Sequence, residues 1–222
     1  MKGKIQVPKV GVDASFELEV KEVEEFLSTI TPEFVKDLGG ILSDTVRHWR
    51  FRNEVKILKR TKKLITQSGL DAKAIPLKVL VPLIEASSLE EDSRMQERWA
   101  NLLANGLTRR AEVKPNYVEI LKELSPTEAL VMDKLFEEAI SEPDVKKRFQ
   151  RQYSRQRIAE WLKLEDEQAN LLVENLFRLN LCRMPGSTGM IFGENMRVAV
   201  STTDIFELTT TGFDFVRACR TL

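Results

Sequence analysis

The sequence predicts a mainly α-helical protein with two domains, an all-helical domain followed by a smaller domain of mixed α+β structure. Apolar residues recur at helical spacing through most of the chain up to Leu124. The dipeptide Ser125-Pro126 then combines a helix-capping residue with a residue suited to the first helical turn. Beyond it, helical patterns give way to two short strand-like segments joined by turn residues. We therefore expect an N-terminal arm over 1–15, a helical domain over 16–124 and an α+β domain over 125–222.

The charge balance limits the partners that the chain as a whole can attract. Its 222 residues include 34 Lys and Arg and 34 Asp and Glu, so the formal net charge is zero. Nucleic acid or anionic lipid would therefore have to be bound by a local patch. Hydrophobic residues at 42% and charged residues at 31% are typical of a soluble globular protein.

Several kinds of site are excluded by the residues that the chain lacks. His48 is the only histidine, and Cys182 and Cys219 are the only cysteines, so the usual zinc sites cannot be assembled. A Ser-His or Cys-His catalytic pair would have to use His48. The sequence has no Walker A motif, no apolar run near the roughly 20 residues of a membrane span, and no apolar signal core. We expect a cytoplasmic protein with no catalytic residues, metal, cofactor or transmembrane segment, and the sequence favours a protein without enzymatic activity.

The helical domain is expected to begin with an acidic helix over 16–28. Its apolar side consists of Leu18, Val23, Phe26 and Leu27. Thr31 then caps a long helix over 32–67, and Gly69 ends it. The apolar stripe of the long helix shifts near 50–53, so the helix either bends or breaks there or packs its second half on another surface. In that second half the apolar side consists of Phe51, Val55, Leu58 and Ile65.

Two shorter helices complete the expected helical domain. An apolar segment follows Pro76, and Ser87 and Ser88 give a capping pattern for a helix that reaches about Leu107. The core side of this helix consists of Met95, Trp99, Leu102 and Leu103. A short helix over 115–124 ends the domain.

The last third of the chain predicts a different order of elements. We expect helices over 126–139, 154–162 and 165–180, strands over 181–184 and 206–208, and a turn over 185–189. Apolar residues of the first and third helices include Leu130, Val131, Leu135, Phe136, Leu171, Leu172, Leu176, Phe177 and Leu179. Ser154 and Thr209 are the expected N-caps of the second helix and of a final helix. This order is typical of a winged helix-turn-helix, so the domain over 125–222 is expected to be winged-helix-like.

Three separated blocks carry a resemblance to a known family. They are LSDTVRHWRFRNEVKILKR (42–60), IPLKVLVPLIEASSLEEDSRMQERWANLLANGL (75–107) and NYVEILKELSPTEALVMDKL (116–135). In this order they resemble Abi-alpha, a bacterial family placed among abortive-infection proteins, over about residues 30–135. The winged-helix-like end resembles the usual continuation of these proteins. The resemblance implies a predominantly helical protein that acts in antiviral defence, and it brings no catalytic residues to this chain.

The most concentrated basic segment lies in the second half of the long helix. Residues 47–63 contain eight Lys and Arg against one acid, Glu54. A basic stripe is expected from Arg52, Lys56, Lys59 and Lys63, with Arg47, Arg50 and Arg60 nearby. These cations could neutralise the phosphates of nucleic acid or of lipid headgroups. The alternative is pairing within the chain, for which the following segments offer Glu85, Glu90, Glu91, Asp92 and Glu97.

A second basic patch precedes the helices of the winged-helix-like domain. It consists of Lys146, Lys147, Arg148, Arg151, Arg155 and Arg157. These residues could contact a nucleic-acid backbone without sequence specificity. The helix that would read the major groove opens with Glu165, Asp166 and Glu167, which would repel phosphates. We therefore favour protein association or dimerisation for this domain.

Three hypotheses for function remain open from the sequence. The first is a phage-defence protein that acts by partner binding through its helical domain, with a protein partner or self-association expected. The second is a winged-helix regulator that binds DNA through the basic segments. The third is a magnesium-dependent nuclease built on carboxylates such as Asp44, Glu54 or Glu91. Membrane-surface binding by the basic amphipathic segment over 50–65 is a weaker alternative.

Overall fold

The protein is described by a computed structural model that covers residues 14–30, 45–186 and 204–221. These residues are mainly helical with one small three-stranded sheet, so the predicted helical fold class is confirmed at that level. The chain divides into two compact units, 1–123 with 218–222 and 124–217. Within the described ranges, no helix is both long enough and apolar enough to cross a membrane.

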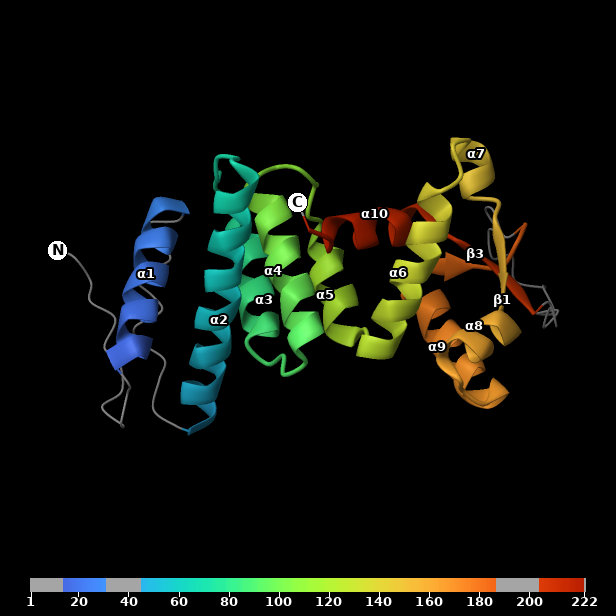
Figure 1. The fold of residues 1–222 in the computed structure, drawn as a ribbon, viewed down its shortest axis with the longest axis horizontal. Helices are drawn as coiled ribbons and strands as arrows, with labels where there is room; N and C mark the ends of the chain where they lie inside the picture. Colours follow the sequence, from blue (N-terminus) through green and yellow to red (C-terminus); the bar gives the residue numbers. More distant parts are fainter. Residues whose placement is uncertain (1–13, 31–44, 187–203, 222) are drawn as a thin grey trace, which may run out of the picture. The chain divides into compact units, whose positions relative to one another are not determined.

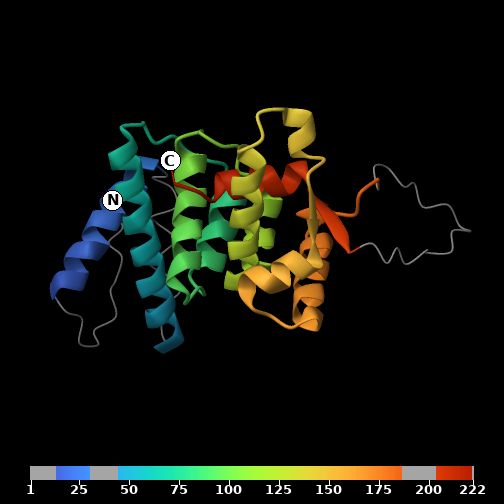
Figure 2. The same cartoon turned by 45° about the vertical axis from the view of Figure 1, so that its right-hand side comes forward.

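The first unit is a set of packed helices. They are α1 (Ala14–Ile30), α2 (Thr45–Ser68), α3 (Leu77–Ser87), α4 (Ser93–Leu107) and α5 (Pro115–Glu123). Every residue over 99–107 of α4 is buried, so α4 is the central helix of this unit. Helix α2 packs against α4 on one side and against α1 on the other, as Figures 1 and 2 show. The predicted core residues Met95, Trp99, Leu102 and Leu103 are all buried, which confirms that prediction.

Helix α1 confirms half of the residues predicted for its apolar side: Val23 and Leu27 are buried, whereas Leu18 and Phe26 are not. The buried residues are Phe16, Val20, Val23 and Leu27. Leu18, which was expected on the apolar side, is 66% exposed. At 100° per residue Leu18 lies on the side opposite Phe16, and the steps of four, three and four residues from Phe16 to Leu27 define one stripe. The rings of Phe16 and Phe51 then meet edge to face at 5.9 Å, which joins α1 to α2.

Helix α2 is uninterrupted over its described length, so the chain does not break near 50–53. Its predicted apolar residues Phe51, Val55, Leu58 and Ile65 are all buried, so the second half of the helix packs on the core. Gly69 follows the last helical residue at a φ of 66°, a left-handed conformation that ends helices and that glycine adopts without strain. The predicted arm, the Thr31 cap and the part of the predicted long helix before Thr45 lie outside the described residues.

The start of α4 differs from the prediction. Ser87 and Ser88 lie at the end of α3, and the N-cap of α4 is Asp92. The Asp92 carboxylate accepts hydrogen bonds from the backbone N–H groups of Arg94 (2.8 Å) and Met95 (3.1 Å). These bonds, the one from Met95 first, lower the pKa of Asp92.

A buried polar cluster holds the 88–92 connection and explains this shift of the cap. The Asn53 side-chain amide donates to the carbonyl oxygens of Ser88 and Glu90, each at 3.1 Å. The Gln96 amide donates to the same Glu90 carbonyl at 2.8 Å. Because these partners are more than 30 residues from Asn53 along the chain, a local capping pattern could not have predicted them.

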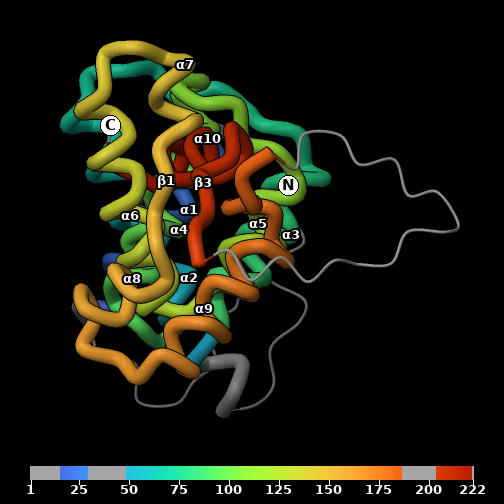
Figure 3. Tube along the Cα trace, turned by 90° about the vertical axis from the view of Figure 1, so that its right-hand side faces the viewer, coloured from blue at the N-terminus to red at the C-terminus, as the bar shows by residue number. Residues whose placement is uncertain are grey.

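The second unit combines short helices with the sheet. Its elements are α6 (Pro126–Ile140), α7 (Val145–Arg148), β1 (Gln152–Ser154), α8 (Arg155–Leu162), α9 (Asp166–Arg178), β2 (Cys182–Arg183), β3 (Ile205–Leu208) and most of α10 (Thr210–Ala218). The sheet is antiparallel in the order β1-β3-β2, with Tyr153 opposite Phe206 and Cys182 opposite Leu208. Figure 3 shows β1 and β3 side by side.

The predicted caps of this unit are confirmed. The Ser154 hydroxyl accepts from the Arg157 N–H at 3.1 Å, and the Thr209 hydroxyl accepts from the Gly212 N–H at 2.8 Å. Ser125 forms a reciprocal capping box with Glu128 at the start of α6. A Cβ on Gly212 would lie 2.2 Å from the carbonyl oxygen of Leu181, so only glycine fits the first turn of α10.

Two details of the second unit were not predicted correctly. Strand β1 was not predicted, because three residues are too few to show an alternating pattern. The strand exists because it pairs with β3, some 50 residues later. Leu130 (39% exposed) and Leu171 (63% exposed) were grouped with buried residues but lie on the outer faces of α6 and α9. Of the predicted turn over 185–189, Pro185 and Gly186 are described, and the remaining residues are not.

Candidate functional site

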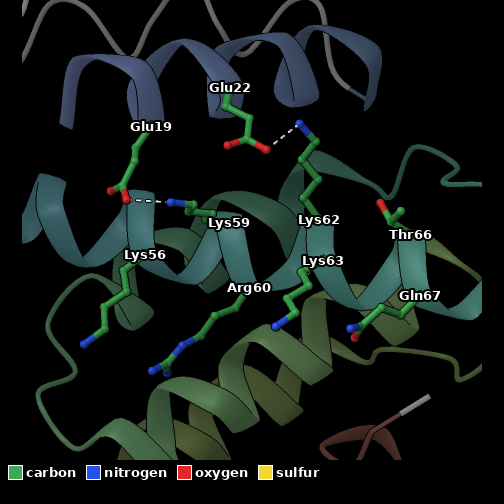
Figure 4. A pocket seen from close by; sticks show the side chains of 9 residues that line it. All are labelled: Glu19, Glu22, Lys56, Lys59, Arg60, Lys62, Lys63, Thr66 and Gln67. Carbon is green, nitrogen blue, oxygen red and sulfur yellow. Dashed lines mark hydrogen bonds and ion pairs between the residues drawn. The ribbon is translucent and has the colours of Figure 1, made fainter. Parts of the chain in front are cut away.

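The exposed face of α2 forms the floor of a groove of about 560 Å³, shown in Figure 4. Helix α1 contributes two carboxylates to it. The lining residues are Glu19, Glu22, Lys56, Lys59, Arg60, Lys62, Lys63, Thr66 and Gln67. Five cations therefore face two carboxylates, and the groove carries a net positive charge.

One row of cations in the groove is paired with α1. Figure 4 shows Lys59 and Lys62 pointing toward this helix. The Lys59 ammonium lies 2.5 Å from the Glu19 carboxylate, and the Lys62 ammonium lies 3.0 Å from that of Glu22. The hydrogen bond from Lys62 and its charge lower the pKa of Glu22. All four side chains remain between about a third and a half exposed, so water and salt reach both ion pairs.

A second row points away from α1 on the other edge of the same helix face. It consists of Lys56, Arg60 and Lys63, with Gln67 one turn further, as Figure 4 shows. The Arg60 guanidinium donates one hydrogen bond to the Ser93 carbonyl oxygen, at 3.1 Å. Lys56 and Lys63 are exposed and have no ion-pair partner among the residues that the structure describes. Their charges are therefore available to a ligand.

The structure divides the predicted basic stripe among several environments. The Arg50 side chain donates to the Ser88 hydroxyl at 2.9 Å, and the Arg52 guanidinium lies over the Phe16 ring at 5.3 Å. The Arg47 side chain lies outside the described part of the chain. Two of the stripe's members, Lys56 and Lys63, thus have no partner within the described ranges.

The ion pairs of α2 go to α1 and not to the acids expected after the helix. Sequence reasoning missed Lys62 as a member of the site, together with Glu19 and Glu22. A signal was present, because the two glutamates are three positions apart, and so are Lys59 and Lys62. Residues three positions apart share a helix face, so two neighbouring helices with the same spacing can pair such residues in succession.

Comparison with known proteins identifies the family of this chain. The family model described as abortive infection alpha matches residues 50–219. The chain belongs to the abortive infection alpha family. This confirms the resemblance seen in the sequence, and the match includes every cation of the groove but leaves α1 outside. No curated protein and no solved structure matches the chain.

Glu54 is the one acid among the basic residues of α2 in this abortive infection alpha protein. Burial raises its pKa to about 7, the nearby Arg50 charge opposes that shift, and the Glu85 carboxylate adds to it. Of the other carboxylates considered for a nuclease, Glu91 is exposed and Asp44 lies outside the described residues. In the described ranges, no three His, Cys, Asp or Glu side chains are grouped so that they could hold a metal ion.

The second basic patch of the abortive infection alpha chain is mostly bound to its own unit. Arg151 and Arg157 both reach the Glu138 carboxylate, at 2.8 and 2.6 Å. Arg155 donates to the Asn170 side chain at 3.2 Å and lies over the Phe177 ring.

Arg148 donates to the Glu142 carbonyl oxygen at 3.0 Å and lies over the Phe213 ring. Lys146 and Lys147 are exposed on the short helix α7, where their charges stay in solvent. The four arginines of this patch are therefore held by their own unit, and only its two lysines are free to attract a phosphate backbone.

Proposed function

We propose that this protein contributes to phage defence by binding an anionic partner through the basic face of α2, without catalysing a reaction. The observation that supports this proposal most directly is the pair of unpartnered cations, Lys56 and Lys63, in a groove with a net positive charge. The family provides the biological context, since its description refers to abortive infection.

Binding suits the chemistry of the groove better than catalysis does. Its polar groups are ammonium, guanidinium, hydroxyl and amide groups, all of which can donate hydrogen bonds to an anion. The only carboxylates that line it, Glu19 and Glu22, are ion-paired with Lys59 and Lys62. No residue of the lining combines a nucleophile with an adjacent base, as covalent catalysis requires.

We also propose that the unit over 124–217 is a winged helix. The order α6, α7, β1, α8, α9, β2, β3, with the sheet order β1-β3-β2, supports this assignment. In this proposal α9 is the helix that would enter a major groove. Glu165 lies at its N-cap, and Asp166 and Glu167 are exposed in its first turn, where they would repel DNA.

Association with a protein is therefore the role that we propose for this unit, in preference to the DNA-binding regulator. The four arginines of its basic patch support the same choice, because each of them already contacts Glu138, Asn170 or the Glu142 carbonyl oxygen. The proposed compartment is the cytoplasm, where the buried thiols of Cys182 and Cys219, which are not joined in a disulfide, would stay reduced.

The proposal is tested by phage challenge of bacteria that express the full chain. We expect the wild type to lower the efficiency of plating and the number of infected cells that release progeny. The variant Lys56→Ala/Lys63→Ala should lose this protection, because it removes the two free charges of the groove. The matched control is Lys146→Ala/Lys147→Ala, which removes two exposed lysine charges from the other unit.

Two results would contradict the proposal. If wild-type cells gave plaques as efficiently as cells without the protein across a broad panel of phages, the defence role would be wrong. If the two double variants protected equally well, the groove on α2 would not be the functional surface. Immunoblots of each variant establish that equal amounts of protein are compared.

A further inference from the structure

We infer that the groove on α2 binds the phosphate backbone of nucleic acid without reading its sequence, and that Glu19 and Glu22 of α1 compete with the phosphates for Lys59 and Lys62. This inference rests on the proposed function, because it names the class of the anionic partner. It concerns a surface of the first unit and makes no use of the winged helix.

The residues that line the groove favour a polyanion over a protein. All nine of them are charged or polar, and none is aromatic or aliphatic. The buried centres of protein–protein interfaces are enriched in aromatic residues and methionine, and their affinity comes from a few such anchors. The apolar residues of this part of α2, such as Val55 and Leu58, are buried against the protein's own core. A ligand of the groove is therefore held by charge and hydrogen bonds, which a phosphate backbone satisfies.

The spacing of the second row of cations also fits a chain of phosphates. Lys56, Arg60 and Lys63 follow one another at intervals of four and three residues. With a rise of about 1.5 Å per residue, the row extends roughly 10 Å along α2. One strand of a duplex places a phosphate about every 3.4 Å of its axis, so the row faces about three phosphates. The groove offers no ring on which a base could stack, so binding should not depend on the base sequence.

The two carboxylates of α1 occupy the places that further phosphates would take. Each accepts a hydrogen bond from a lysine ammonium, as a phosphate oxygen would, and both ion pairs are open to solvent. Solvent-exposed ion pairs of this kind are weak, so a polyanion can displace them. Helix α1 lies outside the residues that match the family model, so this competitor is separate from the family's matched region. Removing the two negative charges should therefore strengthen binding.

The test is a salt titration by fluorescence anisotropy with labelled 20-mer DNA, single-stranded and duplex, in several unrelated sequences. Lys56, Lys63 and Arg60, whose guanidinium is bonded only to a neutral carbonyl oxygen, together give a slope of log K against log salt of about −2 for single strands and about −2.7 for duplex. For single strands this means about a 20-fold loss of affinity between 50 and 200 mM salt. We expect equal affinity for the unrelated sequences.

Three variants separate the parts of the inference. Lys56→Gln/Lys63→Gln should reduce the single-strand slope to about −0.7, because only Arg60 of the second row remains. Glu19→Gln/Glu22→Gln should tighten binding and steepen the slope toward about −3.5, because Lys59 and Lys62 become available. Lys146→Gln/Lys147→Gln should behave as the wild type. Far-UV circular dichroism of each variant establishes that the fold is retained.

The outcomes that overturn the inference are distinct. Absence of binding at 50 mM salt, or binding that does not weaken with salt, would exclude a phosphate backbone as the ligand. An unchanged affinity of Glu19→Gln/Glu22→Gln would exclude competition by α1. Tighter binding of labelled poly-glutamate than of either DNA would assign the groove to an acidic protein. If Lys56→Ala/Lys63→Ala lost phage protection but the wild type did not bind DNA, the proposed function would stand and this inference alone would be overturned. If the wild type bound DNA but gave no phage protection, this inference would stand and the proposed function would be overturned.

Discussion

Helix α2 and the segment over 146–157 are the two basic regions of the molecule, and they use their charges differently. The segment contains six cations, and its four arginines all contact acceptors or rings of their own unit. On α2 the described arginines are likewise held, by the Ser88 hydroxyl, the Phe16 ring and the Ser93 carbonyl oxygen. The free cations of both regions are lysines.

In both regions, which cations are held and which stay free follows from the type of basic residue. A guanidinium is planar, weakly hydrated and able to donate several hydrogen bonds in fixed directions, so it is readily retained by carboxylates, carbonyls and aromatic rings. An ammonium is strongly hydrated and stays in solvent unless a carboxylate is brought close to it. Each region therefore keeps two lysines in solvent, Lys56 and Lys63 on α2 and Lys146 and Lys147 in the segment. The regions differ in what is ion-paired: on α2 two lysines meet glutamates of α1, whereas in the segment the ion pairs are made by arginines.

The largest effect on this comparison is expected from Glu138→Gln. Glu138 holds both Arg151 and Arg157, and its side chain is 22% exposed. Replacing its charge leaves two partly buried guanidinium groups without an anion, which should lower the free energy of unfolding by about 2 kcal/mol. Urea denaturation followed by circular dichroism measures the change.

The matched control for that experiment is Glu174→Gln. Glu174 is exposed and lies 4.0 Å from Arg155, so its loss should change stability by less than about 0.5 kcal/mol. If the two variants were equally stable, the arginines of the second unit would not depend on Glu138, and the contrast with α2 would disappear.

A pH-dependent effect is expected from Glu54→Gln on α2. The pKa of Glu54 is raised from 4.5 to about 7 in the folded chain, so the folded state keeps a proton that the unfolded state releases. Wild-type stability should therefore fall as the pH rises from about 4.5 to about 7 and then level off. The variant has no such charge and should be more stable than the wild type at pH 8, with a much smaller difference at pH 5. Equal differences at the two pH values would mean that Glu54 ionises normally.

The smallest effect is expected from the lysines of the groove themselves. Lys59→Gln/Lys62→Gln removes two solvent-exposed ion pairs and should lower the melting temperature slightly, by less than Glu138→Gln does. Lys56→Gln/Lys63→Gln removes unpaired charges and should leave the melting temperature unchanged or raise it. Thermal melts at low salt give the order of the two variants. The reverse order would show that the pairing between α1 and α2 does not persist in solution.

The sequence by itself determined the features that depend on neighbours within one or two helical turns. The glycine that ends α2, the caps at Ser154 and Thr209, and the buried stripe of α4 were all predicted correctly. Each of these signals depends on backbone geometry or on a local hydrogen bond, so it survives without knowledge of the fold. The three sequence blocks also identified the family, because a family is recognised by the order of residues and not by their positions in space.

Only the tertiary structure decided which charges are free and where several elements begin. Pairing of Lys59 with Glu19 joins residues 40 positions apart, and the bonds from Asn53 that displaced the expected cap of α4 span 35 and 37 positions. The face that α1 buries and the existence of β1 were set in the same way, by packing partners distant in the chain. Composition counts the cations of a segment, but their availability depends on which acids the fold brings within a few ångströms, because Coulombic and hydrogen-bond interactions act over that range.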